Sequence, residues 1–155
     1  MNFTTKEQLE MVIQQFKELT AVYRNAISYT GISENEFWIW YTLIFSDAEY
    51  SQQDICSIWS LPKQTVNNII THMVKKELAI LEVIPGTRNQ KIIRLTEQGR
   101  QYGTGIVTPV CNAEERAANR LDQEEFAVCI NVIGKFIKLL KEEINNEESR
   151  ELAKP

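Results

Sequence analysis

Hydrophobic residues recur every three or four positions from Leu9 to Ile27, just after a Thr4–Glu7 capping pair. This pattern predicts a long amphipathic helix that stops near Gly31. A second helix is predicted from Ser33 to about Phe45, and its residues are apolar nearly all round. Such a helix is expected to lie buried at the centre of the core.

The stretch from Tyr50 to Lys76 predicts two short helices joined by a tight corner. Ser51 is a good N-cap for the first helix, with Asp54 placed to face the first-turn amides. Pro62 marks the corner, because proline is tolerated at a helix start but not in its interior. The second helix is expected to bury an apolar stripe, which comprises Val66, Ile69, Ile70 and Met73.

Two β-branched, apolar runs follow, at Ala79–Ile84 and Lys91–Leu95, with turn-forming residues at 85–90 between them. They predict a β-hairpin. A hairpin directly after a helix-turn-helix is a wing, and its tip carries Arg88, whose long charged side chain can enter a DNA minor groove. The alternative interpretation is an ordinary exposed hairpin tip.

Thr96 is placed to cap a further helix, in which the glycines from Gly103 onward and Pro109 predict a kink or a break. Asp122 then starts a second long helix, whose apolar stripe runs from Phe126 to Ile144. The first long helix needs such a partner to cover its own stripe, from this chain or from another copy.

The outward face of the predicted helix after Pro62 is unusual, because no acidic residue occurs between Lys63 and Val74. Its polar residues are Lys63, Gln64, Asn67, Asn68, Thr71, His72 and Lys75. Gln and Asn can form two hydrogen bonds with adenine, and Lys can neutralise phosphates. The face therefore favours a DNA-reading helix-turn-helix, with an ordinary polar surface helix as the alternative.

At 155 residues the chain fits one domain, and 43% apolar residues suffice for a core. The net charge of −4 argues against a nucleic-acid binder, but its distribution does not. Residues 51–95 hold six basic and three acidic residues, a net charge of +3, so the remainder carries −7. A positive middle between acidic flanks is typical of a DNA-binding core on an acidic scaffold.

Other chemistry finds little support in the sequence. The three cysteines are widely spaced, and the single histidine, His72, has no acid or cysteine close by. We therefore expect no enzyme, no metal and no cofactor. No signal peptide and no membrane span are predicted, so a cytoplasmic protein with reduced thiols is expected. Cys56, beside Asp54, is interpreted as a structural thiol and not as an oxidant sensor.

The order of elements resembles the MarR family of bacterial transcription regulators over nearly the whole chain. The strongest matches are PKQTVNNIITHMVKKELA, which begins at Pro62, and RLTEQG, which begins at Arg94. The resemblance implies a mainly α fold with a small β-hairpin wing. Residues 33–96 would form the winged helix-turn-helix lobe, residues 1–31 and 97–150 the dimerisation helices, and 151–155 a frayed tail of this single domain.

The resemblance also implies a homodimer that binds a pseudo-palindromic site on double-stranded DNA, with repression as the favoured outcome. The expected base-reading residues are Gln64, Asn67, Asn68 and Thr71. Expected phosphate and wing contacts are Ser51, Lys63, Thr65, His72, Lys75, Lys76, Arg88, Asn89, Lys91 and Arg94. A crevice for a small aromatic effector would involve Tyr23, Trp38, Tyr41 and Tyr102, for which core packing is the alternative role.

The chain departs from the family pattern in three places. The family's acid–Arg brace of the wing is replaced by Thr87 and Asn89, with Arg88 between them. A common Ser-Arg pair in the reading helix is Asn67-Asn68 here, which favours an A·T-leaning site. A common glycine after that helix is Glu77. A winged-helix module that has lost DNA binding and docks on another protein is the alternative function.

Overall fold

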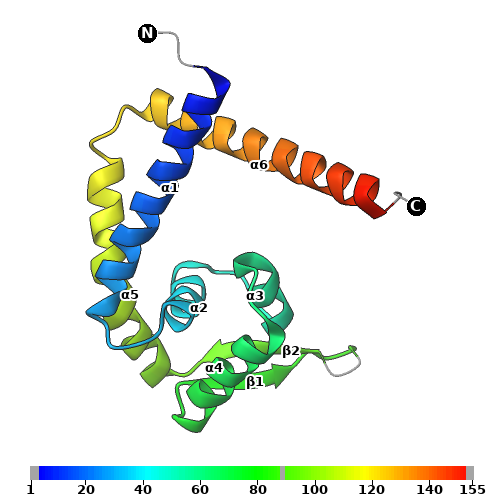
Figure 1. Cartoon of the computed structure of the whole chain (residues 1–155). Helices are drawn as coiled ribbons and strands as arrows, with labels where there is room; N and C mark the ends of the chain where they lie inside the picture. The colour runs from blue at the N-terminus through cyan, green and yellow to red at the C-terminus, as the bar shows by residue number, and fades with distance from the viewer. Residues whose placement is uncertain (1–3, 88–89, 153–155) are drawn as a thin grey trace. The chain divides into compact units, whose positions relative to one another are not determined.

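The computed structural model describes residues 4–87 and 90–152, with side chains as far as Glu147. The chain divides into two compact units, Met1–Cys111 and Asn112–Pro155. Within these described residues, eight elements follow one another (Figure 1): α1 (Thr5–Ser28), α2 (Glu34–Phe45), α3 (Gln52–Trp59), α4 (Lys63–Lys75), β1 (Ala79–Val83), β2 (Lys91–Leu95), α5 (Glu97–Ala118) and α6 (Gln123–Leu152). The predicted mainly α fold with a two-stranded hairpin is confirmed.

The predicted capping residues begin their helices as expected. A capping box forms at Thr4 and Glu7 before α1, and another at Ser51 and Asp54 before α3. Before α2, Ser33 accepts the backbone N–H of Glu36, but the Glu36 carboxylate accepts the indole N–H of Trp40 instead of returning to the cap. These bonds satisfy amides that the first helical turn leaves without partners.

Helix α2 forms the centre of the core, as its apolar sequence predicts. Phe37, Ile39 and Trp40 are fully buried. The same cluster contains Ile27 from α1 and Val107 from α5, and also buried residues of α3, α4 and β2. Helices α1 and α5 therefore contribute to the core that positions the helix-turn-helix. The predicted separation of a DNA-binding lobe from dimerisation helices stays a prediction.

The corner between α3 and α4 depends on one left-handed residue. Ser60 has φ 51°, and the Leu61 N–H donates to the carbonyl of Cys56. Pro62 then serves as the N-cap of α4. Val66, Ile70 and Met73 are buried as predicted, while Ile69 is half-buried. The stripe turns α4 so that its polar residues face outward.

The turn after α4 forms although the family's usual glycine is Glu77 here. The Glu77 N–H donates to the Val74 carbonyl and the Leu78 N–H to the Met73 carbonyl, which is the Schellman pattern. Glu77 adopts φ 58°, a left-handed conformation that costs a non-glycine residue about 1 kcal/mol. Hydrogen bonding therefore keeps the turn sharp despite the substitution.

Strands β1 and β2 form the predicted antiparallel hairpin, in which Ala79 pairs with Leu95. The hairpin also joins the segment before α3, because the Ile93 N–H donates to the Tyr50 carbonyl and Ser51 forms a bridge with Ile92. Helix α4 packs on β1 and α3 on β2 (Figure 1). The wing residues Arg88 and Asn89 lie outside the described residues.

The break predicted between Gly103 and Pro109 does not occur, because α5 runs as one helix from Glu97 to Ala118 with Pro109 inside it. Gly103 is buried, and a Cβ at this position would lie 2.5 Å from the Trp40 ring. The absence of a side chain thus lets α5 pack closely on α2. This packing outweighs the low helix propensity of glycine and proline.

The start of α5 is locked to the turn after α4. Thr96 accepts the Gly99 N–H at 2.9 Å and donates its hydroxyl to the Glu77 carbonyl at 2.7 Å. A Cβ on Gly99 would lie 1.8 Å from the carbonyl oxygen of Leu78. The RLTEQG segment therefore has a packing role, since only glycine fits at that close approach.

The second unit consists of the end of α5 and the long helix α6. Asp122 caps α6 as predicted, because its carboxylate accepts the N–H groups of Glu124 and Glu125. Every described α6 side chain, up to Glu147, is exposed or half-buried in the single chain. A long helix without buried residues has little tertiary stabilisation of its own.

We expect Gly99→Ala to destabilise the protein by about 3 kcal/mol, because the new methyl group must displace backbone atoms. Gly105→Ala is the matched control, since a Cβ there meets no heavy atom within 4 Å among the described residues. That variant is expected to gain about 0.5–1 kcal/mol from helix propensity. Denaturant unfolding measures both, and equal effects would contradict the close approach.

The α3 capping box predicts a pH-dependent contribution to stability. Hydrogen bonds from the Ser51 hydroxyl and backbone N–H hold the pKa of Asp54 below its usual range. Because the folded-state pKa is lowered, the stabilisation is present above the unfolded-state pKa and is lost as pH falls through the folded-state pKa. Asp54→Ala should therefore cost about 0.5 kcal/mol near neutral pH, and less in acid.

Unfolding of wild type and Asp54→Ala across acidic and neutral pH tests this dependence. Asp47→Ala, at an exposed position in the loop before α3, controls for the loss of one negative charge. A difference between wild type and Asp54→Ala that stays constant down to strongly acidic pH would show that the carboxylate charge is not what stabilises the cap.

Candidate nucleic-acid interface

The polar face of α4 is exposed, as the sequence predicts. Lys63, Gln64 and Asn67 are exposed, as are Asn68, Thr71, His72 and Lys75. Thr65 is half-buried beside Val66. The face thus presents amide and hydroxyl groups to solvent, while the opposite face of the same helix is held by the core.

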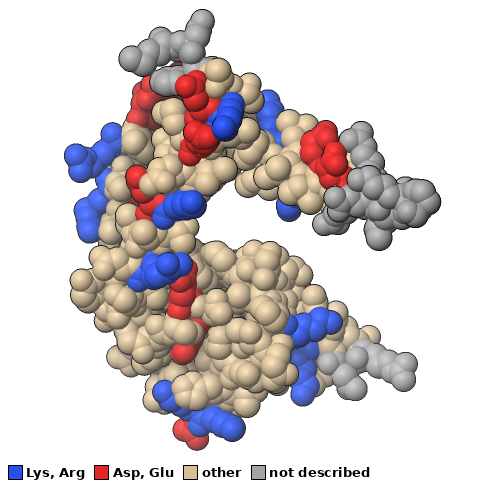
Figure 2. Space-filling model, viewed as in Figure 1, with Lys and Arg blue, Asp and Glu red and all other residues tan. Residues whose placement is uncertain are grey.

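Basic side chains stand at both ends of this face. Lys63 is the first residue of α4, and Lys75 and Lys76 are at its end. Figure 2 shows separate groups of basic side chains on the first unit with uncharged side chains between them. Positive charge therefore flanks an uncharged hydrogen-bonding surface, which is an arrangement suited to phosphates on either side of a groove.

The N-terminus of α4 adds to this positive potential. Among the described residues, no side chain caps the Pro62 end of the helix, and its first turn holds no acid. The free first-turn N–H groups and the helix dipole favour an anion at this end. By contrast, α1, α2 and α3 each carry an acid in the first turn.

Two of the exposed amides on α4 are hydrogen-bonded to each other. The side-chain NH₂ of Gln64 donates to the side-chain carbonyl of Asn68 at 2.7 Å. Residues four apart lie on the same side of a helix, so the two amides form one pair on the exposed face. Sequence analysis treats these amides as independent, and their spacing is the only sequence signal for the pair.

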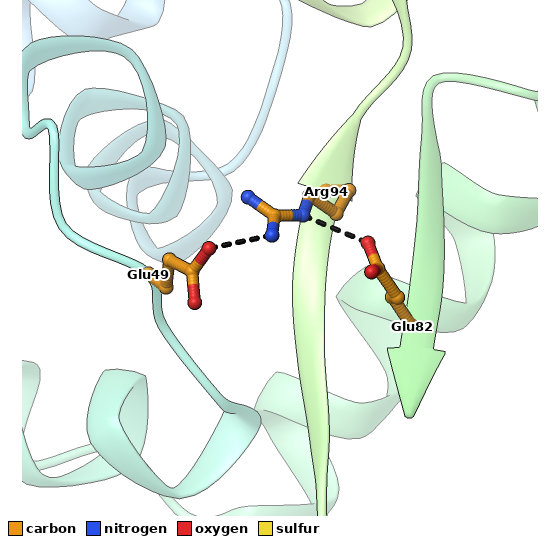
Figure 3. Close-up of polar contacts among 3 residues, drawn as sticks. All are labelled: Glu49, Glu82 and Arg94. Carbon is orange, nitrogen blue, oxygen red and sulfur yellow. Dashed lines mark hydrogen bonds and ion pairs between the residues drawn. The ribbon is translucent and has the colours of Figure 1, made fainter. Parts of the chain in front are cut away.

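Arg94 occupies a different environment from the lysines of α4. Its guanidinium lies between two carboxylates, with Nε donating to Glu82 at 2.8 Å and a terminal N–H group donating to Glu49 (Figure 3). The hydrogen bonds that Arg94 donates to the carboxylates of Glu82 and Glu49 raise the pKa of Arg94 above its usual range. Arg94 thus joins β2, β1 and the loop before α3, and its charge is compensated there.

The remaining predicted contacts differ in how available they are. Lys91 begins β2 and is exposed. The Ser51 hydroxyl is engaged in the α3 capping box, where it donates to Asp54 at 2.7 Å. The contacts predicted for Arg88 and Asn89 concern residues outside the described part of the chain. The assignment of all these side chains to phosphates stays a prediction.

Three of the four predicted crevice residues lie together. The Trp38 ring centroid is 5.2 Å from Tyr23 and 5.5 Å from Tyr41, whereas Tyr102 packs on Trp40. Each of these rings packs against another aromatic ring. Their role in ligand binding stays a prediction.

The sequence analysis did not identify Trp59, whose ring also belongs to the aromatic cluster around Trp38. Its ring stacks on Trp38 with centroids 4.7 Å apart, and its indole N–H donates to Thr42 at 2.7 Å. The position of Trp59 at the end of the helical stripe of α3 was the available signal. The sequence analysis also missed Glu49, which binds Arg94, because Glu49 lies in a loop where residue spacing provides no signal.

No group of three or more His, Cys, Asp or Glu side chains in residues 4–87 and 90–147 could hold a metal ion. Cys56 is buried, which agrees with a structural thiol. Within the same part of the chain, no helix has the length and hydrophobicity needed to span a membrane.

Comparison with known proteins identifies the fold. No protein-family model and no curated protein sequence matches the chain. Among solved structures, a MarR family regulator from Neisseria meningitidis is similar, with a TM-score of 0.79 and 20% identity over 95% of this chain and 99% of that one.

Two further solved structures are similar to this chain, and both are of proteins described as binding DNA. S. aureus MepR in its DNA-binding conformation has a TM-score of 0.67 and 19% identity, over 89% of this chain and 99% of that chain. BpsR of Bordetella bronchiseptica, whose DNA binding is regulated by 6-hydroxynicotinic acid, has a TM-score of 0.62 and 15% identity, over 88% and 97%. The chain therefore has the winged-helix fold of the MarR family transcription regulators.

Proposed function

We propose that the chain is a homodimeric, sequence-specific DNA-binding transcription regulator. The observation that carries this proposal is the exposed, acid-free face of α4, which a helix-turn-helix holds beside a β-hairpin. In such a lobe the second helix enters the major groove. Gln64, Asn67, Asn68 and Thr71 would then contact base edges.

Phosphate contacts would come from the ends of α4 and from the wing. Lys63 and the free amides at the start of α4 would meet one backbone, with Lys75 and Lys76 at the far end of the helix. Thr65 and His72 are further candidates on α4. Lys91 begins β2, and Arg88 and Asn89 lie between the two strands in sequence, so all three are proposed to lie near the minor groove.

Arg94 and Ser51 would affect DNA binding indirectly, because their side chains help to hold the helix-turn-helix lobe in shape. Arg94 is bound by two carboxylates in the free protein, and the Ser51 hydroxyl closes a capping box. A phosphate would have to compete with these partners. Arg94 is thus the weakest phosphate ligand among the predicted basic residues, and holding the hairpin against the loop before α3 is its favoured role.

The homodimer is supported by apolar surface that a single chain leaves exposed. Helix α1 exposes Leu9, Met11, Ile13, Phe16, Leu19 and Val22. Helix α6 exposes Val128, Ile130, Val132, Ile137, Leu139, Leu140 and Ile144. Patches of this extent mark interaction surfaces. The α6 positions cover a broad arc of the helix, so more than one helix of a partner would be needed to bury them.

Two-fold symmetry then determines the kind of DNA site. A dimer would place two α4 helices in major grooves about one helical turn apart on a pseudo-palindromic site. We favour repression as the outcome, as the family resemblance implies. The likeness to MepR in its DNA-binding conformation supports the proposed partner.

Control by a small aromatic effector is the finer part of this proposal. The likeness to BpsR, whose DNA binding responds to 6-hydroxynicotinic acid, supports it. The residues proposed to face such a molecule are Tyr23, Trp38 and Tyr41, whose rings contact one another through Trp38, and Tyr102, whose ring packs on Trp40.

The DNA-binding face is tested with a Lys63→Ala, Gln64→Ala, Asn67→Ala triple variant. Wild-type affinity for a site selected from random DNA should fall steeply with salt, because phosphate contacts release counterions. The triple variant should lose specific binding while the dimer remains. Fluorescence anisotropy at several salt concentrations measures the affinity, and sedimentation measures the dimer.

A control triple variant likewise removes one basic and two amide side chains, from exposed positions of α5: Gln98→Ala, Arg100→Ala and Gln101→Ala. It should keep most of the affinity. Wild-type binding that does not change with salt, or no specific binding at all, would contradict the proposal and would favour the protein-interaction module.

The dimer is tested with Ile137→Glu on the apolar arc of α6. A buried unpaired carboxylate is strongly unfavourable, so the variant should sediment as a monomer and lose helix content. Asn131→Glu adds the same charge on the polar face of α6 and should leave the dimer intact. Retention of the wild-type mass by Ile137→Glu would show that this arc is not the interface.

A further inference from the structure

We infer that Gln64 and Asn68 act as one coupled reading unit, in which Gln64 selects adenine and Asn68 selects a base that offers only acceptors, guanine or thymine. The inference rests on the proposed function and specifies the sequence that its reading helix would recognise. It differs from the expectation that each amide on α4 favours adenine independently.

The coupling follows from the hydrogen bond on the exposed face of α4. The NH₂ group of Gln64 donates to the Asn68 carbonyl oxygen at 2.7 Å. Both side chains are exposed, and they are one helical turn apart. Gln–Asn pairs at this spacing stabilise helices, so the bond is expected to persist in the free protein.

The bond makes the two amides chemically different. A side-chain amide has a carbonyl acceptor and two N–H donors. Gln64 uses one N–H for Asn68, and keeps its carbonyl and its second N–H. Asn68 uses its carbonyl for Gln64, and keeps both N–H donors. Gln64 therefore remains both an acceptor and a donor, whereas Asn68 becomes mainly a donor.

The donors and acceptors that remain on Gln64 and on Asn68 match different base edges in the major groove. Adenine presents the N6 donor and the N7 acceptor together, and so it needs a side chain that both accepts and donates. Gln64 still meets this requirement. Guanine presents acceptors at N7 and O6, and thymine presents an acceptor at O4, so a donor such as Asn68 suits either.

Asn67 provides a comparison on the same helix. It is exposed and lies between the paired residues in sequence, but the bond that orients the pair joins Gln64 to Asn68. The orientation of the Asn67 amide is not set by this bond. Its substitution should relax at most the bases that Asn67 itself contacts.

The test is selection of bound sites from random double-stranded DNA by the full chain and its variants. Wild type should select adenine at one base pair of each half-site and guanine or thymine at another. Asn68→Asp still accepts the bond from Gln64 but offers no donor. It should retain the adenine preference at the position that Gln64 reads. At the position that Asn68 reads, it should prefer cytosine, whose N4 group donates, about tenfold over guanine or thymine.

Asn68→Ala removes the partner of Gln64, and should relax both positions, because the Gln64 amide can then turn over. Gln64→Ala frees the Asn68 carbonyl, and should let adenine into the Asn68 position. Gln98→Ala, which removes an exposed amide from α5 outside the proposed DNA-binding face, is the control and should leave both of these preferences within about twofold of wild type.

The outcomes separate this inference from the proposed function. If Asn68→Ala relaxes one base pair only, or if wild type selects adenine at both positions, the amides are independent and the inference is wrong while DNA reading stands. If wild type selects no sequence at all, the proposed function fails, and the coupled reading fails with it.

Discussion

The close approach of α5 to the turn after α4 is the constraint on which the DNA-facing part of the fold depends. The Leu78 carbonyl accepts the Thr96 N–H, and its oxygen lies 1.8 Å from the position that a Cβ of Gly99 would take. The Leu78 N–H closes the Schellman turn at the end of α4. One residue thus joins α4, the base of the hairpin and the start of α5. The direction of α4 relative to the hairpin follows from this junction and from the stripe that α4 buries.

A second junction holds the other end of the helix-turn-helix. Arg94 binds Glu82 across the hairpin and Glu49 in the loop before α3, and the Ile93 N–H donates to Tyr50 in the same loop. Exposed ion pairs contribute little energy individually. Their value here is geometric, since a planar guanidinium with two carboxylates restricts how the hairpin turns against α3. These contacts hold the base of the hairpin against the loop before α3.

Local sequence patterns predicted much of this fold, because capping residues and the spacing of apolar residues determine where its helices begin and which face they bury. Ser51 and Thr96 act as predicted caps, and Val66, Ile70 and Met73 form the predicted buried stripe of α4. Features set by distant partners could not be predicted in this way. The Glu49–Arg94 contact spans 45 residues, and α5 stays unbroken because Gly103 fits against Trp40.

The polar face of α4 shows a further limit on what can be predicted from the sequence. Residue types indicate that α4 carries amides, but an amide has both donors and acceptors, and its partner decides which of them remains available. The bond from Gln64 to Asn68 is local in sequence, yet its direction becomes visible only in three dimensions. A family comparison by residue type would equate Asn67 with Asn68. The hydrogen bond distinguishes them, so neighbouring identical residues on one reading helix can prefer different bases.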